Sequence, residues 1–164
     1  MIKLKALLSL KKSLNQNKLI VQREEGYIAE EIFHFFPRAS EKEINKLPEY
    51  TPKDLIAFLR LHNGADLFVH PENGGGTHLF SVEEIVEHQE IWDCPEGFTP
   101  IGTGMDGLWI VCQTENRESE RNFIWIGEFM SFEDEFEKTS LDFSTWFERF
   151  ILAQGSSFWE WGRE

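Results

Sequence analysis

The apolar pattern of the chain changes at Asn63-Gly64, and this change constrains the fold more than any other feature. Before it, residues 51–54 have the composition of a helix start: Thr51 can cap, Pro52 suits the first helical position and Asp54 interacts favourably with the helix dipole. The residues that then share one helical face are Leu55, Phe58, Leu59 and His62. Asn63 and Gly64 tolerate the left-handed backbone conformation that ends helices, so we expect the helix to stop there.

After Gly64 the apolar residues occur in short runs separated by turn residues, a pattern that indicates strands of a mostly antiparallel sheet. The five runs are Leu67 to Val69, His78 to Phe80, Phe98 to Ile101, Leu108 to Thr114 and Phe123 to Phe129. One helix is expected at residues 81–88, because Ser81 and Glu84 have the spacing of a capping box. The polar segment Asn116 to Asn122 is expected to be a hairpin turn.

Both ends of the chain predict helices. The closing helix has one apolar face and stops at Gly155. The residues of that face are Phe143, Trp146, Phe147, Phe150 and Ile151. The first fifteen residues or so predict an amphipathic helix with its apolar residues at Leu4, Leu7, Leu8 and Leu14. Between this helix and Thr51, Pro37 ends an apolar run, Ile32 to Phe36, and Ser40 and Glu43 have the capping-box spacing of a short helix through Leu47.

The order of these segments predicts the fold class. Helices, a run of strands and a final helix indicate an α+β domain with a mostly antiparallel sheet of about five or six strands and helices packed on one face. No linker or repeat interrupts residues 1–164, so we expect a single domain whose first forty residues form an N-terminal helical segment. With 15 Phe and 6 Trp, the chain can fill a hydrophobic core. Cys94 and Cys112 form no CxxC pair and fit a reduced protein.

The charge of the chain excludes one class of ligand and favours another. Its formal net charge is -13, which argues against nucleic acid as a partner because the phosphate backbone would repel it. The charge is uneven: the residues before Glu24 carry +6 and no acid, which leaves -19 for the rest. A charge of this size keeps a free protein soluble and favours a monomer. No secretion signal or membrane span is apparent, so we expect a cytoplasmic protein.

Three patterns resemble catalytic or ligand-binding motifs but lack the secondary structure or the further residues that those motifs require. Residues 102–107 match G-x-G-x-x-G, but a strand follows them where a dinucleotide site needs a helix, so a glycine-rich hairpin is the better interpretation. His70 and His78 flank a glycine-rich turn near Glu72, yet the spacing lacks the further ligands of a zinc site. Carboxylate pairs are abundant among 29 acids and none is marked out as an acid and base. We therefore expect no metal, no cofactor and no enzymatic activity.

Two strands carry apolar residues on both faces. In Leu108 to Gln113, alternation places Trp109 and Val111 opposite Ile110 and Cys112, and Trp125 lies in a similar segment, Phe123 to Glu128. Such strands are typical of the centre of a sheet that is covered on both sides, which makes these aromatic residues core. If helices cover only one face, the other face instead presents Trp109 and Trp125 within an acidic rim, the anatomy of a protein-binding surface.

Several short motifs resemble the signature of the SUKH superfamily, which includes a yeast cell-wall-synthesis regulator and many bacterial immunity proteins. The first group is Leu47-Pro48, the helix through Phe58-Leu59, then His62-Asn63-Gly64 and the strand at Leu67-Phe68. Later matches are Leu79-Phe80 before a short helix, Pro100-Ile101-Gly102, Asp106 before a strand, and the closing helix. The resemblance runs from about Glu41 to Ile151. Ala65 departs from it, because many members have a further glycine after Asn-Gly.

The resemblance implies a binding function. Bacterial members commonly act as immunity proteins that neutralise a polymorphic toxin, often a nuclease, and the family has no common catalytic residues. A nuclease needs a basic groove for phosphates, and an acidic protein can be steered into it and block it. Our first hypothesis is therefore an immunity protein that binds a cognate toxin, a basic nuclease domain. The alternatives are a non-toxin protein-binding regulatory or scaffold module of the same fold and, third, a hydrolase that uses a carboxylate pair.

The candidate contact residues combine aromatic and acidic side chains. The first set lies on the later strands and comprises Asp106, Trp109, Glu115, Trp125 and Glu128. The second set is an acidic patch on the helix at residues 81–88 and comprises Glu83, Glu84 and Glu87.

Overall fold

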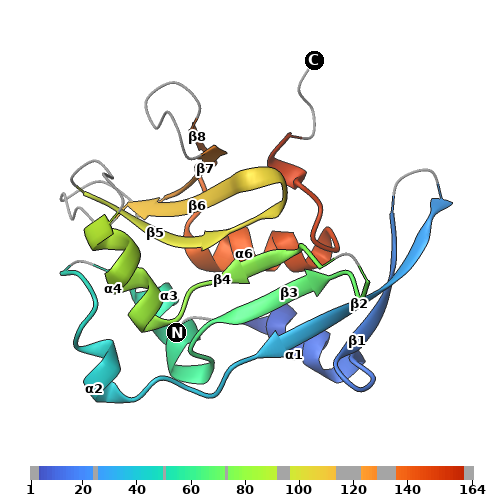
Figure 1. The fold of residues 1–164 in the computed structure, drawn as a ribbon, viewed down its shortest axis with the longest axis horizontal. Coiled ribbons are helices and arrows are strands. Elements are labelled where there is room, and N and C mark those ends of the chain that lie inside the picture. Colours follow the sequence, from blue (N-terminus) through green and yellow to red (C-terminus); the bar gives the residue numbers. More distant parts are fainter. Residues whose placement is uncertain are drawn as a thin grey trace.

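The fold is built on one antiparallel sheet whose strands lie side by side in the order of the sequence (Figure 1). The computed structural model describes residues 4–23, 26–49, 51–72, 74–91, 97–113, 123–128 and 136–160. Within them the eight strands are β1 (Lys18–Gln22), β2 (Ile28–Phe35), β3 (Ala65–Val69), β4 (Thr77–Leu79), β5 (Phe98–Thr103), β6 (Leu108–Gln113), β7 (Ile124–Glu128) and β8 (Glu137–Lys138). Each pairs antiparallel with the next.

The helices lie mainly on one side of this sheet. They are α1 (Lys5–Ser13), α2 (Glu41–Ile44), α3 (Lys53–Leu61), α4 (Val82–Ile91) and α6 (Phe143–Leu152), with short 3-10 turns η2 (Met105–Gly107) and η3 (Phe158–Glu160). Figure 1 shows α1 and α6 behind the sheet and α4 beside β4 and β5. The order and layers confirm the predicted α+β class with an antiparallel sheet.

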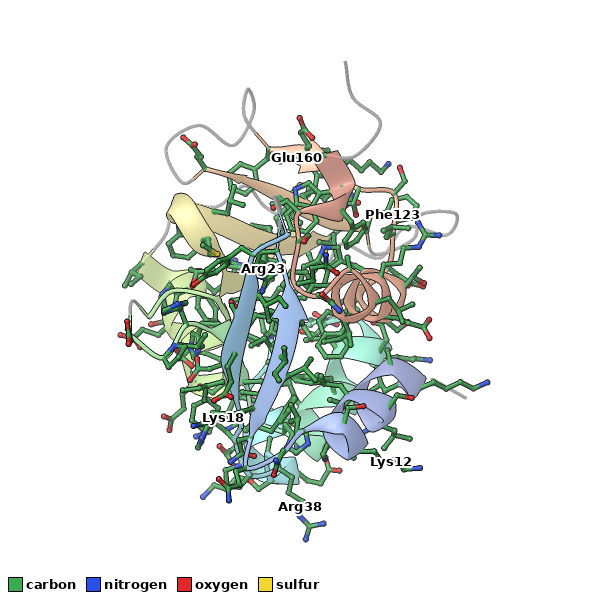
Figure 2. The ribbon with its side chains drawn as sticks, turned by 90° about the vertical axis from the view of Figure 1, so that its right-hand side faces the viewer. Lys12, Lys18, Arg23, Arg38, Phe123 and Glu160 are labelled. Carbon is green, nitrogen blue, oxygen red and sulfur yellow. The ribbon has the colours of Figure 1, made fainter. Side chains whose placement is uncertain are left out.

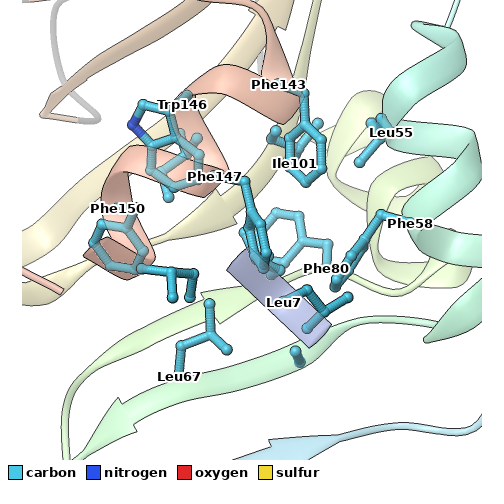
Figure 3. Packing of buried hydrophobic residues seen from close by; sticks show 14 of the residues in the cluster. Leu7, Leu55, Phe58, Leu67, Phe80, Ile101, Phe143, Trp146, Phe147 and Phe150 are labelled. Carbon is cyan, nitrogen blue, oxygen red and sulfur yellow. The ribbon is translucent and has the colours of Figure 1, made fainter. Parts of the chain in front are cut away.

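The main core lies between the sheet and the helices α1, α3 and α6. Its centre is a group of aromatic rings from α3 and α6, with Phe58 5.8 Å from Phe143 and 5.3 Å from Phe147 between ring centroids (Figure 3). Leu7 of α1 and Leu67 of β3 belong to the same cluster and are fully buried. All five apolar residues predicted for the face of the closing helix are buried, so that prediction is confirmed.

The sheet has more strands than the five or six expected. β1, β2 and β8 were not predicted, although the run Ile32 to Phe36 overlaps the end of β2. The buried positions of β2 follow a period of two, at Ala29, Glu31 and Phe33, but the sequence hides this alternation because one of these positions is a glutamate and Ile28 is exposed. Glu31 is 6% exposed because Arg23 pairs with it. A buried ion pair has no signature in the hydrophobic pattern of a single strand.

The N-terminal helix is confirmed, but its buried face is rotated from the predicted one. Leu7 and Leu10 are buried with Ala6, whereas Leu8 is 58% exposed. The helix is attached to α3 through His62, as the Lys11 ammonium donates to Nε2 of the ring at 2.8 Å and Nδ1 bonds the Phe36 carbonyl at 2.9 Å. Burial, together with the Lys11 charge, lowers the pKa of His62 although the Phe36 carbonyl opposes this.

The start of α3 differs from its prediction. Thr51 does not cap this helix, because its hydroxyl donates to the Pro48 carbonyl and Pro52 occupies the N-cap position. Asp54 acts between two helices instead: one carboxylate oxygen accepts the Leu55 amide and the other accepts the Ser144 amide in the first turn of α6, both at 2.9 Å. Burial raises the pKa of Asp54 against these hydrogen bonds.

Asn63 is the junction between three helices. Its side-chain oxygen accepts the Val82 amide at the start of α4 at 2.8 Å, and its side-chain nitrogen donates to Glu43 of α2 at 3.2 Å. Glu43 is itself half of the predicted capping box with Ser40, in which both reciprocal hydrogen bonds are present. Because Asn63 directly follows the C-cap of α3, one amide side chain sets the relative positions of α2, α3 and α4.

Gly64 allows the chain to turn from this junction into β3. Its φ is +95°, and a Cβ atom placed on it would lie 2.8 Å from the Leu79 carbonyl oxygen and 3.0 Å from the Ser81 amide nitrogen. Both the left-handed backbone and the contact with the β4 backbone therefore require glycine. The predicted helix end at Asn63-Gly64 is confirmed.

Gly64→Ala should lower the free energy of unfolding by about 2–4 kcal/mol, because the methyl group meets backbone atoms in addition to the cost of the positive φ. Urea denaturation measures this. Gly107→Ala is the matched control, since Gly107 also has a positive φ of +78° but no atom within 4 Å of the added Cβ. It should cost only about 1 kcal/mol. Equal losses in the two variants would contradict the role of the contact.

Candidate functional site

The sheet face opposite α1, α3 and α6, here called the open face, carries a row of polar and aromatic side chains. His34 pairs with Asp66, Asp66 with His78, His78 with Thr103, and Thr103 with Trp109 in the register of five successive strands. Residues directly opposite each other in antiparallel strands point to the same side of the sheet. We call this set the cross-strand row, and its side chains are half-buried or exposed. Thr77 and Leu79, which flank His78 in β4, are buried on the core side.

His78 lies at the centre of the row between two carboxylates. Its Nδ1 is 2.6 Å from a carboxylate oxygen of Asp66, and its Nε2 is 2.8 Å from one of Glu84. Burial by itself lowers the pKa of His78, but the hydrogen bonds and charges of Glu84 and Asp66 outweigh it and raise the pKa. The two carboxylate contacts therefore favour the protonated form of His78.

Glu84 contacts two elements at once, the start of α4 and His78 of β4. Its carboxylate accepts the Ser81 amide at 3.0 Å while the Ser81 hydroxyl accepts the Glu84 amide at 3.2 Å, which confirms the predicted capping box of α4. Partial burial raises the pKa of Glu84, but the hydrogen bonds of Ser81 and His78 and the charge of His78 lower it overall. The position of α4 on the sheet is thus fixed by an ionic contact with the cross-strand row.

Aromatic side chains continue the row toward β6. The His88 ring of α4 stacks on Phe80 with 4.3 Å between centroids and lies 5.5 Å from the Trp109 ring. Phe80 is also in edge contact with Trp109 at 6.1 Å. His88 is half-buried because α4 packs against Trp109. Trp109 is consequently part covered and part accessible.

Trp125 belongs to a second, smaller apolar cluster on the open face. Val111 and Phe136 are its buried members, and Phe98, Trp109 and Trp125 pack against them. Phe98 and Trp125 meet edge to face at 5.5 Å. Val111 is fully buried, while Ile110 and Cys112 on the other side of β6 belong to the main core. β6 is therefore covered on both faces, as the pattern of its sequence indicates.

The structure brings together some of the predicted contact residues and separates others. Glu83 and Glu87 are exposed on α4 beside the row, whereas Glu84 is half-buried in the contacts described above. Glu128 is exposed but pairs with Leu108, so it points to the opposite face from Trp109 and Trp125. Asp106 lies in η2 next to the row, and Glu115 lies outside the described residues.

The structure also shows what the glycine-rich segment and the His70 and His78 pair form. Residues 102–107 connect β5 to β6 through η2, which confirms a connection between strands and not a helix start. Gly102 is needed there because a Cβ atom would lie 2.6 Å from the His78 carbonyl oxygen. His70 forms a bridge with Gly74 and its Nδ1 accepts the Glu72 amide, apart from the carboxylates that hold His78. Across the described ranges, no group of three or more His, Cys, Asp or Glu side chains is arranged to hold a metal ion.

Sequence reasoning missed His34 and Asp66 as members of the site. Their place in the row depends on the pairing of β2 with β3 and of β3 with β4, and β2 was not predicted. One signal pointed to Asp66: it is the polar residue within a short apolar strand, where alternation gives it the face opposite Leu67. Among the described residues, no helix is long and apolar enough to cross a membrane.

Comparison with known proteins identifies the family of this chain. Residues 38–149 match the SMI1/KNR4 family (SUKH-1), which confirms the resemblance drawn from the short motifs. Two proteins of Bacillus subtilis (strain 168) are similar. Uncharacterized protein YnaB is 30% identical over 132 residues, which cover 78% of this chain and 87% of that protein. Uncharacterized protein YobM is 34% identical over 117 residues, which cover 67% of this chain and 62% of that protein.

The ionic contacts of His78 predict a pH-dependent stability. Because its pKa is raised by folding, the stabilisation is fully present below the unfolded value of about 6.5 and is lost as the pH rises through the folded value. Urea unfolding between about pH 6 and pH 9 should show this loss in the wild type and not in His78→Gln.

His34→Gln is the matched control for this measurement. His34 lies in the same row and makes no ion pair among the described contacts, so its replacement should leave the pH dependence unchanged. A wild-type stability that stays level between about pH 6.5 and pH 9, or a His78→Gln variant with the wild-type slope, would refute the role of His78.

Proposed function

The chain belongs to the SMI1/KNR4 family (SUKH-1), and from this premise we propose that it is an immunity protein that binds and neutralises a cognate toxin. The proposed partner is a basic nuclease domain, and the proposed action is binding without catalysis. Bacterial members of the SUKH superfamily commonly act in this way. The proposed binding surface is the open face together with the adjoining helix α4.

One observation carries the proposal of a basic partner. α4 presents Glu83, Glu87 and Glu90 as exposed side chains next to the half-buried Trp109. Glu84, the fourth acid of the helix, is held in the capping box and by His78, so it fixes the helix and leaves the other three for a partner. An aromatic residue with a charged rim is the usual anatomy of a protein-binding site.

The charge of the whole molecule supports the same partner. A net charge of -13 steers association with a basic surface and opposes association with nucleic acid. A nuclease that cleaves a polyanion carries such a basic surface in its substrate groove. Occupation of that groove by the acidic side of this protein would exclude the substrate without any chemical step.

The decisive experiment is co-expression with any toxin-like C-terminal domain that is encoded beside this gene. Survival of the cells and a copurifying complex are the expected results. Continued killing while this protein is soluble and abundant would overturn the proposal. Normal growth after deletion of this gene alone, combined with a complex of another kind, would favour a regulatory or scaffold module of the same fold.

The acidic face of α4 gives a sharper test with purified proteins. The double charge reversal Glu83→Lys and Glu87→Lys should slow association with a catalytically inactive toxin domain about tenfold at low salt and should weaken its salt dependence. Stopped-flow or surface-plasmon measurements at several salt concentrations provide the rates. Both side chains are exposed, so the fold should be retained.

A matched control separates local from overall charge. Glu49→Lys with Glu160→Lys makes the same change in net charge at two exposed positions outside α4. This control should reduce the association rate clearly less than the α4 variant. Equal rates for the two variants would show that overall charge, and not α4, steers the partner.

A further inference from the structure

The open face continues beyond the cross-strand row onto a patch of aliphatic side chains in β1, β2 and β3. Ile32 pairs with Val69, and Ile20 lies opposite Glu30, which makes Ile28 and Ile32 its diagonal neighbours on the same side of the sheet. We call Ile20, Ile28, Ile32 and Val69 the aliphatic patch. Ile20 is 68% exposed and Ile28 is 66% exposed.

Such exposure is unusual for this position in a sheet. The solvent-facing side of an antiparallel sheet normally carries polar residues, and a contiguous exposed apolar patch on a soluble protein marks an interaction site. The core side of the same two strands is well covered, as Val21 and Phe33 are each 1% exposed. These strands thus carry large apolar residues on both sides, although only one side has a covering layer among the described residues.

The edge of β1 is not available for pairing with another strand. The amide and carbonyl of Lys18 are both bonded to Asn15 at 3.0 Å, and the Gln22 amide donates to the side chain of Gln154 at 3.1 Å. Figure 2 shows Lys18 and Arg23 at opposite ends of the strand pair. Among the described contacts of this edge, the backbone groups of Ile20 and the carbonyl of Gln22 have no partner, which is too short a stretch to pair with another strand. A partner must therefore meet the face of β1 and β2 and not their edge.

Charge indicates what kind of partner fits this face. Glu30 lies within the aliphatic patch, directly opposite Ile20 and between Ile28 and Ile32 on the same face of β2. Asp66 follows in the cross-strand row, and the exposed glutamates of α4 lie beyond it. Lys18 is already paired with Glu30 at 3.3 Å. Apolar side chains that alternate with an acid on one strand and continue into an acidic surface complement an apolar contact surface that also carries basic residues.

We propose that the aliphatic patch of β1 and β2 is the apolar half of the partner-binding surface and is contacted face-on by the same basic toxin domain that α4 attracts. This inference rests on the proposed function. β1 and β2 precede the residues 38–149 that match the family. The acidic helix accelerates association, and the aliphatic patch slows dissociation.

The test uses the full chain and a catalytically inactive form of the toxin domain that the co-expression experiment identifies. Ile20→Thr with Ile28→Thr keeps β-branched residues on the strands and removes apolar contact area. This double variant should bind at least tenfold more weakly, mainly through faster dissociation. Leu152→Ser is the control, since Leu152 is 74% exposed on α6, on the other side of the sheet, and its change should leave affinity unaltered.

A second variant separates the two modes of binding. Gln154→Ala removes the side chain that occupies the Gln22 amide and exposes more of the β1 edge. Face-on binding predicts unchanged affinity, whereas a partner that adds a strand to β1 would bind more tightly. Wild-type affinity in the isoleucine double variant overturns the inference and leaves the proposed function intact. Failure of the wild-type protein to bind the toxin domain overturns both.

Discussion

The arrangement of the whole domain depends on the hydrogen bonds of one amide side chain, that of Asn63. It holds the first amide of α4 and a carboxylate of α2 directly after α3 ends, while Gly64 lets the chain pass against the β4 backbone into the sheet. The position of α4 in turn places Glu84 against His78 and His88 against Trp109. The short Asn-Gly motif is therefore a structural requirement of the proposed binding surface and not a part of that surface.

The two sides of the sheet have different kinds of stabilisation. The core side is held by close packing of large rings, such as Phe58 between Phe143 and Phe147. The open side is held by ionic and aromatic contacts in a row, with His78 between two carboxylates at its centre. A surface built in this way presents charge and ring faces in fixed positions, so it meets a partner with little loss of side-chain entropy.

The sequence predicted the elements whose periodicity is set by the core. The face of α6, the capping boxes at Ser40 and Ser81 and five of the strands follow from local patterns, and the structure contains all of them. β1 and β2 were missed because a buried pair, Arg23 with Glu31, and exposed isoleucines both obscure their alternation. The cross-strand row was missed for a related reason: its members come together only through strand pairing, which no single segment encodes.

The acidic residues of α4 fall into two classes with different structural roles. A change of Glu84 would disturb the helix start and the His78 contact together, so the fold constrains this position. Glu83, Glu87 and Glu90 point to solvent and can change sign or size at almost no cost in stability. A lineage whose partner keeps altering its surface can therefore exchange three residues of this helix one at a time while the scaffold beneath them stays constant.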